Sequence, residues 1–308
     1  MSTLRFLGWG VSNWQAAFEW IAAGLRTRFP DLRTEFLGKG PQRMEALAAG
    51  HVDVAITTPT ADAAMARAGI GPHAAPLPEL RAIAALPHHD RLVLALTERA
   101  AEQYGIQTFA DLAAERPPLR LAAPERDGDS PSYTVGRLLA GSGLKHEDLE
   151  SWGGAWIEVG APMPGPGLIA GGQADGVFNE AYMLLHAVEQ PLRFIPFEAA
   201  TLDQLRSELG LSTTEIEVNE FPGVHEPVPV VDFSDWVIMV RADLQDEIAG
   251  AMAEIVINDR QTFERRYHAT PVRDSALYYP MRPEALCRTG DVPLHPAAQR
   301  FYKQIGVL

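Results

Sequence analysis

Apolar and polar positions in the first part of the chain follow two periods, one typical of strands and one typical of helices. An apolar run at residues 4–7 has the length of a buried strand and ends at Gly8. The next apolar residues recur as on the buried face of an amphipathic helix: Trp14, Ala17, Phe18, Ile21, Ala22 and Leu25. Two further strands are predicted at residues 34–37 and 52–56, with a helix from Pro41 between them. This order predicts right-handed β-α-β units in a mostly parallel sheet.

The middle of the chain carries a short echo of this arrangement. Residues 49–56 and residues 171–178 both place a glycine at the end of a predicted helix, then an aspartate, then an apolar strand. The second copy closes a set of elements that begins with a predicted strand at residues 119–123. Asp53 and Asp175 hold matching positions and are expected to cap or brace their turns. Two similar α/β halves predict two lobes built to one plan.

Two strongly apolar runs, at residues 92–96 and 236–240, are predicted to be crossings between these lobes. The first lobe is therefore expected to be discontinuous, with residues 1–93 and 238–308, and the second to comprise residues 94–237. Two crossings permit hinge bending.

Composition narrows the choice of partners. A chain of 308 residues, 46% of them apolar, can bury about three quarters of its unfolded surface, in keeping with two lobes. The formal net charge of −14 argues against duplex nucleic acid or an anionic membrane as a partner, because both require a basic face. The single cysteine, Cys287, excludes an internal disulfide and a thiolate metal cluster.

The start of the chain lacks the pattern of a secretory signal peptide, because Gly8 follows Met1 too closely for a charged region and an apolar stretch. We therefore expect either a periplasmic protein from which an export signal has been removed, or a cytoplasmic protein. No run approaches the roughly 20 apolar residues of a membrane span, so no membrane insertion is expected.

The C-terminal residues 294–306 read Leu-His-Pro-Ala-Ala-Gln-Arg-Phe-Tyr-Lys-Gln-Ile-Gly. This segment resembles the closing His-Pro-Gly-Ala, Tyr-Lys-Glu, Gly pattern of the TAXI family of TRAP-transporter solute-binding proteins, with Ala297 in place of glycine and Gln304 in place of glutamate. Less specific similarities lie at residues 81–86, 105–112 and 221–223. The resemblance covers most of the chain.

This resemblance implies the type II periplasmic-binding-protein fold. In that α/β fold each of two lobes is a mixed, mostly parallel sheet flanked by helices, and the ligand cleft lies between the lobes. TRAP membrane subunits are the protein partner that the resemblance implies. The chain departs from the family in two binding loops: Lys39, Gly40 and Arg43 stand where the family has a Gly-Ser pair and an asparagine, and residues 127–132 are longer and more acidic. The resemblance therefore does not imply which ligand is bound.

Small ligands in open α/β sheets bind at the carboxyl ends of strands and at helix N-termini, where free amides and the helix dipole favour anions. The positions that meet this condition are Trp9, Ser12, Asn13, Trp14, Lys39, Gly40, Arg43, Thr57, Thr58, Ser130, Ser132, Tyr133, Asn179 and Glu180. The alternative for each of them is a role as a cap or turn residue.

Arg43 is the sharpest candidate, since a guanidinium can bind a carboxylate in bidentate fashion. A cation in the first turn of a helix opposes the helix dipole, which argues for a role beyond helix stability. The alternative is a solvated helix charge. Trp14 fits both a wall of the binding site and the core-facing stripe of its helix.

No pattern in the sequence predicts catalysis, a metal or a cofactor. The histidines of the run His88-His89-Asp90 would point to opposite faces of a strand, so a loop is favoured over a metal site. Cys287 lies far from any glycine elbow or paired histidine motif, which disfavours a nucleophile. Dinucleotide-binding, phosphate-loop, zinc-protease and serine-hydrolase motifs are absent from the sequence.

Two functions of different classes fit these observations. The favoured one is a solute-binding protein that captures a small, carboxylate-bearing organic ligand between two lobes for a TRAP-type transporter. The alternative is a cytoplasmic enzyme or sensor that uses the same fold to act on a small organic acid, with Asp127, Asp129 or Glu180 carrying the proton. The lack of a recognisable acid–base motif favours the binding protein.

Overall fold

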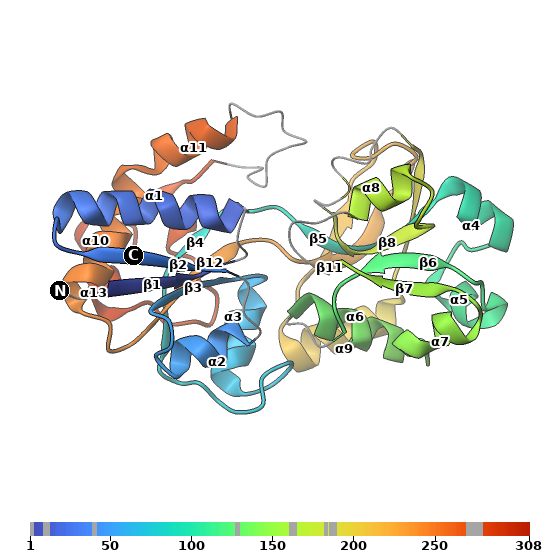
Figure 1. Cartoon of the computed structure of the whole chain (residues 1–308), viewed down its shortest axis with the longest axis horizontal. Helices are drawn as coiled ribbons and strands as arrows, with labels where there is room; N and C mark the ends of the chain where they lie inside the picture. The colour runs from blue at the N-terminus through green and yellow to red at the C-terminus, as the bar shows by residue number, and fades with distance from the viewer. Residues whose placement is uncertain are drawn as a thin grey trace. The chain divides into compact units, whose positions relative to one another are not determined.

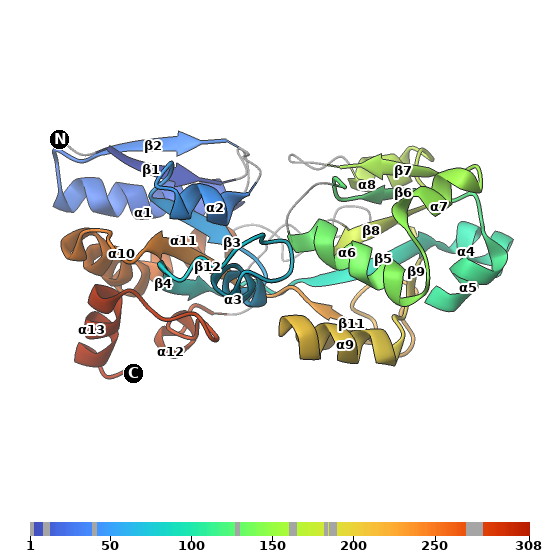
Figure 2. The same ribbon diagram turned by 90° about the horizontal axis from the view of Figure 1, so that it is seen from below.

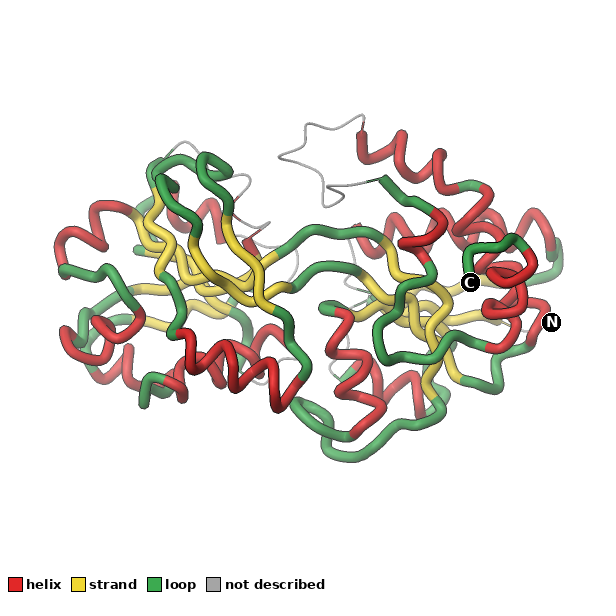
Figure 3. Tube along the Cα trace, turned by 180° about the vertical axis from the view of Figure 1, so that it is seen from behind, coloured by secondary structure: helices red, strands yellow, loops and turns green. Residues whose placement is uncertain are grey.

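A computed structural model describes residues 3–8, 13–38, 42–126, 130–159, 165–181, 184, 190–268 and 280–308. The chain forms two compact units. Unit 1 consists of Met1–His89 and Ser234–Leu308, and unit 2 of Asp90–Phe233. In each unit the strands lie at the centre and the helices outside (Figure 3). Both units are therefore α/β, as the sequence predicted.

The sheet of unit 1 has the strand order β2-β1-β3-β12-β4. Its strands are β1 (Thr3–Leu7), β2 (Arg33–Leu37), β3 (Val54–Thr57), β4 (Leu80–Leu86) and β12 (Trp236–Arg241). β1 runs parallel to β2 and β3, whereas β12 runs antiparallel to β3 and β4. The apolar run at residues 236–240, predicted to be a crossing, thus forms a strand inside unit 1.

Alternate residues of these strands pack against helices on the two faces of the sheet, because successive side chains of a strand point to opposite faces. Val54 and Ile56 belong to the core that α1 and α10 cover, whereas Ala55 belongs to the core beneath α2 and α3 (Figure 1). The helices of unit 1 are α1 (Asn13–Arg28), α2 (Arg43–Ala48), α3 (Thr60–Ala68), α10 (Asp246–Asn258), α11 (Arg260–His268), α12 (Pro283–Leu286) and α13 (Pro296–Gln304).

The sheet of unit 2 has the strand order β10-β11-β5-β8-β6-β7, and β9 pairs with β5 off this path. β6 runs parallel to β7 and β8, while β5 is antiparallel to each of its partners. The strands are β5 (Arg91–Thr97), β6 (Arg120–Ala123), β7 (Ala155–Glu158), β8 (Gly176–Glu180), β9 (Leu192–Ile195), β10 (Thr213–Ile216) and β11 (Val228–Asp232). Every residue of β5 is buried, which explains its unbroken apolar run.

Helices cover both faces of this second sheet, with α8 on one face and α6 and α9 on the other (Figures 1 and 2). They are α4 (Glu98–Tyr104), α5 (Phe109–Glu115), α6 (Ser130–Gly141), α7 (His146–Ser151), α8 (Gly165–Ala170) and α9 (Ala199–Leu209). α6 and α9 approach closely at Gly141, where an added Cβ would lie 2.5 Å from the side chain of Thr201. Both sheets are mixed and flanked by helices, as predicted, but the sheet of unit 2 is not mostly parallel, because β5 and β10 form only antiparallel pairs among the described residues.

Candidate functional site

Several of the predicted binding residues lie outside the described part of the chain. They are Trp9, Ser12, Lys39 and Gly40. Asn13 begins α1, but its side chain is also outside the described part. The remaining candidates fall into one group in unit 1 and one group in unit 2.

In unit 1 the structure brings Trp14 and Arg43 together. The guanidinium carbon of Arg43, the first residue of α2, lies 4.9 Å from the ring centroid of Trp14 in the first turn of α1. Such a cation–π contact is stronger when it is withdrawn from water, and here Arg43 is 5% and Trp14 7% exposed. Arg43 is therefore not a solvated surface charge, which was the alternative interpretation of this residue.

Trp14 is at the same time part of the hydrophobic core. Its ring meets Trp236 edge-to-face with centroids 6.3 Å apart, and Trp236 stacks on His88 at 4.4 Å. The predicted core stripe of α1 is thus confirmed for Trp14, and the same side chain supports the Arg43 guanidinium. His88 lies in a loop, as predicted, and its ring is committed to this aromatic stack.

A chain of hydrogen-bonded polar side chains connects the end of β3 to α2, and all of them are buried except Glu45, which is half-buried. The hydroxyl of Thr57 donates to Asp62 Oδ2 at 2.5 Å, and His73 Nε2 lies 3.3 Å from Asp62 Oδ1. His73 Nδ1 lies 2.9 Å from Oε1 of Glu45. Glu45 follows Arg43 by two residues in α2. Thr57 and Thr58 are both buried at the carboxyl end of β3. Thr57, a predicted binding residue, therefore lies in the same network as the neighbours of Arg43.

This network fixes the charge of its histidine. Burial alone would lower the pKa of His73, but the hydrogen bonds and charges of Asp62 and Glu45 outweigh burial and raise this pKa to about 9. Burial alone would raise the pKa of Glu45, whereas its hydrogen bond to His73 and the positive charges of His73 and Arg43 lower it. Each partner favours the charged form of the other, so His73 is an imidazolium at neutral pH.

In unit 2 the candidates gather at the start of α6. Ser130, its first residue, is 0% exposed, and within the described residues its Oγ has no hydrogen-bond partner. Ser132 instead donates to the carbonyl of Glu125 at 2.5 Å, which holds the preceding loop against the helix. The Tyr133 hydroxyl accepts from Arg137 at 3.3 Å. Of these three residues, Ser130 has the hydroxyl that still requires a partner.

Asn179 and Glu180 end β8, and Asn179 is buried. Asn179 Oδ1 accepts a hydrogen bond from the backbone amide of Glu180 at 2.8 Å, so this side chain braces the end of its own strand. Glu180 is half-buried. α6 packs against β8, so the helix and the strand lie in adjacent layers of unit 2.

The residues that the sequence analysis missed are Glu45, Asp62 and His73. Glu45 and Asp62 lie within short helices as ordinary acidic residues of a first turn, and nothing in the local sequence marks them. His73 follows a glycine–proline turn, a position typical of an exposed loop. Their significance comes from a fold that brings three separate segments together.

Metal and membrane sites do not emerge from the described residues. No group of three or more His, Cys, Asp or Glu side chains among them is placed to hold a metal ion. None of the helices in the described part of the chain combines the length and the apolar character of a membrane span.

Comparisons with solved structures show what the chain resembles. PhnD1 from Prochlorococcus marinus (MIT 9301), in complex with methylphosphonate, is 9% identical over 99% of both chains, with a TM-score of 0.51. The alkanesulfonate-binding protein SsuA from Xanthomonas axonopodis pv. citri, bound to MOPS, is 15% identical over 98% of this chain and 84% of its own, with a TM-score of 0.41. XAC2383 from Xanthomonas citri, bound to ATP, is 15% identical over 100% of this chain and 97% of its own, with a TM-score of 0.47.

The likeness to PhnD1 extends over nearly the whole of both chains and confirms the type II periplasmic-binding-protein fold. No curated protein sequence matches the chain. Residues 39–306 match the NMT1-like family, and the TAXI family expected from the sequence is not confirmed. Since this match spans most of the 308 residues, the chain belongs to the NMT1-like family.

Proposed function

We propose that the chain is a solute-binding protein for a small organic anion, and that the anionic group is a carboxylate. The observation that carries this proposal is the buried hydroxyl of Ser130, which has no hydrogen-bond partner among the described residues and lies at the start of α6. Leaving a buried polar group unsatisfied costs about 1–3 kcal/mol, so a bound solute oxygen would supply a missing interaction. The free amides at the same helix N-terminus favour an anion.

In unit 1, the buried guanidinium of Arg43 also favours an anionic solute. A guanidinium presents a planar fork of donors that matches the two oxygens of a carboxylate. The guanidinium lies against the ring of Trp14 and is withdrawn from water, which strengthens its electrostatic interactions.

We further propose that the chain is periplasmic and delivers its solute to a TRAP-type transporter. It is supported by the C-terminal resemblance at residues 294–306. Part of this segment forms α13, whose first turn is capped by His295 and whose buried Tyr302 donates to the carbonyl of Ile83 at 3.0 Å. Co-purification of the chain with a TRAP membrane subunit from its own cell envelope would test this delivery.

Ligand binding is best tested with a panel of small compounds. Acetate, benzoate, methanesulfonate and methylphosphonate present different anionic groups, and glucose is a neutral control. We expect benzoate or acetate to raise the melting temperature more than glucose does, and calorimetry to give the dissociation constant. Mass spectrometry after long incubation should recover the compound unchanged, whereas repeated turnover would favour the alternative of an enzyme.

Ser142, at the other end of α6, provides a matched control for Ser130. Ser142 follows α6, and its buried Oγ likewise lacks a hydrogen-bond partner among the described residues, but it lies where a helix presents carbonyls rather than amides. Ser130→Ala should weaken anion binding about 5- to 30-fold, and Ser142→Ala should leave it unchanged. Equal affinities of the two variants would contradict the proposal.

A further inference from the structure

We propose that His73 balances the charges around Arg43 and is therefore a positioning residue for anion binding. This inference rests on the proposed function, since it concerns the affinity of the same protein for an anionic solute. The effect of His73 on Arg43 is indirect. It acts through two carboxylates, one of which lies on the same helix as Arg43.

With both neighbouring carboxylates ionised, the geometry around His73 leaves one protonation state that satisfies every contact. Both ring nitrogens face carboxylate oxygens, Nδ1 at 2.9 Å from Glu45 and Nε2 at 3.3 Å from Asp62. An ionised carboxylate can accept but not donate, so both ring nitrogens must carry a proton. His73 is 8% and Asp62 2% exposed, so water does little to screen this pair, whereas the side chain of Glu45 is 31% exposed and its interaction with His73 is screened more.

Counted over four side chains of this network alone, the formal charges sum to zero. Arg43 and His73 contribute two positive charges, and Glu45 and Asp62 contribute two negative charges. When His73 loses its proton, these four side chains carry one net negative charge, and Glu45, whose charge interacts with that of Arg43, loses its imidazolium partner. A negative charge at that place repels an anionic solute and competes with it for the guanidinium.

The two charged groups that raise the pKa of His73 lie on two different helices. Glu45 faces it from α2 and Asp62 faces it from α3, and both raise its pKa. Arg43 of α2 acts on Glu45, and Thr57 at the end of β3 donates to Asp62. His73 thus cross-links α2 to α3 and fixes the hydroxyl of Thr57 through Asp62.

The proton on His73 can be observed without any ligand. We expect the ring resonances of His73, assigned by comparison with His73→Gln, to titrate with a pKa near 9 in the intact chain. The exposed His51 provides an internal reference in the same spectra. A His73 pKa at or below its ordinary value of 6.5 would overturn the inference, whatever the chain binds.

Benzoate is the probe for the effect on binding, because its carboxylate stays ionised from about pH 6 to about pH 10. For the parent chain we expect benzoate affinity to fall about 3- to 10-fold as the pH rises through 9. His73→Gln should bind benzoate more weakly at pH 7 by a similar factor and should lack the pH step. His51→Gln, the matched control, should behave like the parent.

A double variant separates charge from packing. Glu45→Gln combined with His73→Gln removes one negative and one positive charge, so the remaining Arg43 and Asp62 again sum to zero. Its affinity for benzoate should recover toward that of the parent, which a purely structural loss would not allow. The inference fails if the double variant binds no better than His73→Gln or if His73→Gln keeps the pH step. Absence of benzoate binding by the parent at every pH would instead overturn the carboxylate proposal, and this inference with it.

Discussion

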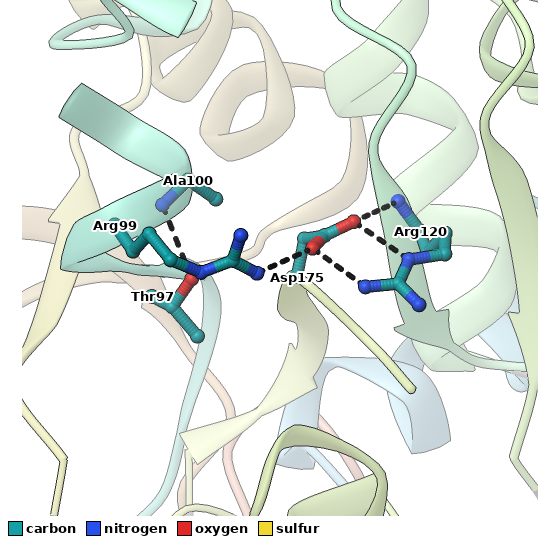
Figure 4. A network of polar contacts seen from close by, with 5 residues as sticks. All are labelled: Thr97, Arg99, Ala100, Arg120 and Asp175. Atoms are coloured by element: carbon teal, nitrogen blue, oxygen red, sulfur yellow. Dashed lines mark hydrogen bonds and ion pairs between the residues drawn. The ribbon is translucent and has the colours of Figure 1, made fainter. Parts of the chain in front are cut away.

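Asp175 Oδ2 accepts hydrogen bonds from both the backbone amide and the Nε of Arg120, at 3.0 and 2.9 Å. The Nη2 of the same guanidinium donates to Oδ1 at 2.9 Å, and Arg99 approaches from the other side (Figure 4). In unit 1, Asp53 Oδ2 accepts the same pair of hydrogen bonds from the amide and Nε of Arg5, at 2.8 and 3.3 Å. In both units an aspartate thus ties the turn after a helix to a neighbouring parallel strand.

The first prediction concerns this brace in unit 2. Asp175→Asn keeps the shape of the side chain but removes the charge that three Arg120 donors share. We expect the free energy of unfolding to fall by about 1–3 kcal/mol, a range that allows for the partial exposure of Arg120. Asp203→Asn, which breaks an exposed ion pair with Arg206, is the control and should change stability by less than about 0.5 kcal/mol.

The pH dependence of this effect provides an internal check. Burial alone would raise the pKa of Asp175, but its hydrogen bonds with Arg120 and the charges of Arg120 and Arg99 lower it below 3.8. A lowered pKa means that the stabilisation is present above pH 3.8 and is lost as the pH falls through the folded-state pKa. Chemical denaturation at pH 7 and near pH 3 should therefore show a smaller difference between Asp175→Asn and the parent at the lower pH.

The α/β character and the internal echo could be predicted from the sequence because both depend on local pattern. Gly50 and Gly172, at matching places in the echo, both adopt positive φ values, 75° and 68°. Asp53 and Asp175 brace their turns as predicted, although their arginine partners lie 48 and 55 residues away in the chain. Periodicity and turn residues mark an element, but they do not identify its long-range partners.

The candidate site was predicted less completely, for the same physical reason. Ser130 and Arg43 were identifiable because a predicted helix start is a position where an anion can bind, and because a cation there opposes the helix dipole. His73 was not, because its role arises from contacts with Glu45 and Asp62, 28 and 11 residues away. Adjacency in three dimensions, rather than any motif, gives that histidine its charge.

His73 should also make stability depend on pH in the alkaline range. Its folded-state pKa of about 9 is above the ordinary value of 6.5, so the stabilisation is fully present below pH 6.5 and is lost as the pH rises through 9. The shift corresponds to about 3 kcal/mol at most. Urea denaturation at pH 6, 7.5 and 9.5 should show this loss in the parent, and a parent-like slope in His73→Gln would contradict it.

His295 should have the opposite effect, in the acid range. Its Nδ1 accepts the amide hydrogen of Ala297 at 3.2 Å and caps α13, which requires that nitrogen to be unprotonated. Burial lowers the pKa of His295 below 6.5, so its stabilisation is present above pH 6.5 and is lost as the pH falls toward the folded-state pKa. His295→Asn keeps a capping oxygen and should show a shallower loss of stability between pH 7 and pH 5, whereas His51→Asn should not.

Two glycines that end helices test how tightly the fold is packed there. Gly69 and Gly210 adopt nearly the same φ, 68° and 69°, but a Cβ on Gly69 would lie 2.3 Å from the Pro76 nitrogen, whereas Gly210 has nothing within 4 Å. Gly210→Ala should therefore cost about 1–2 kcal/mol, the price of the left-handed conformation alone. Gly69→Ala should cost at least about 2 kcal/mol more, because backbone must move. Equal melting temperatures of the two variants would show that the loop after α3 yields easily.

Arg43 is the residue of unit 1 that supports the proposal of an anionic solute. Arg43→Ala removes a buried guanidinium and should weaken benzoate binding about 30- to 1,000-fold, because a lost charge-assisted pair costs about 2–4 kcal/mol. Isothermal titration calorimetry measures this directly. Arg288→Ala, which removes an exposed arginine of the same unit, is the charge-matched control and should stay within about threefold of the parent.

Arg43→Lys tests whether the shape of the guanidinium matters for binding or only its positive charge. A lysine keeps the positive charge, and with it the balance against Glu45 and Asp62, but it lacks the planar fork that stacks on Trp14 and binds two oxygens together. We therefore expect Arg43→Lys to bind benzoate more tightly than Arg43→Ala and more weakly than the parent. If Arg43→Lys matched the parent, a point charge would suffice and the bidentate geometry would be wrong. If Arg43→Ala matched the parent, the guanidinium would be a structural partner of Trp14 and the solute would be held elsewhere.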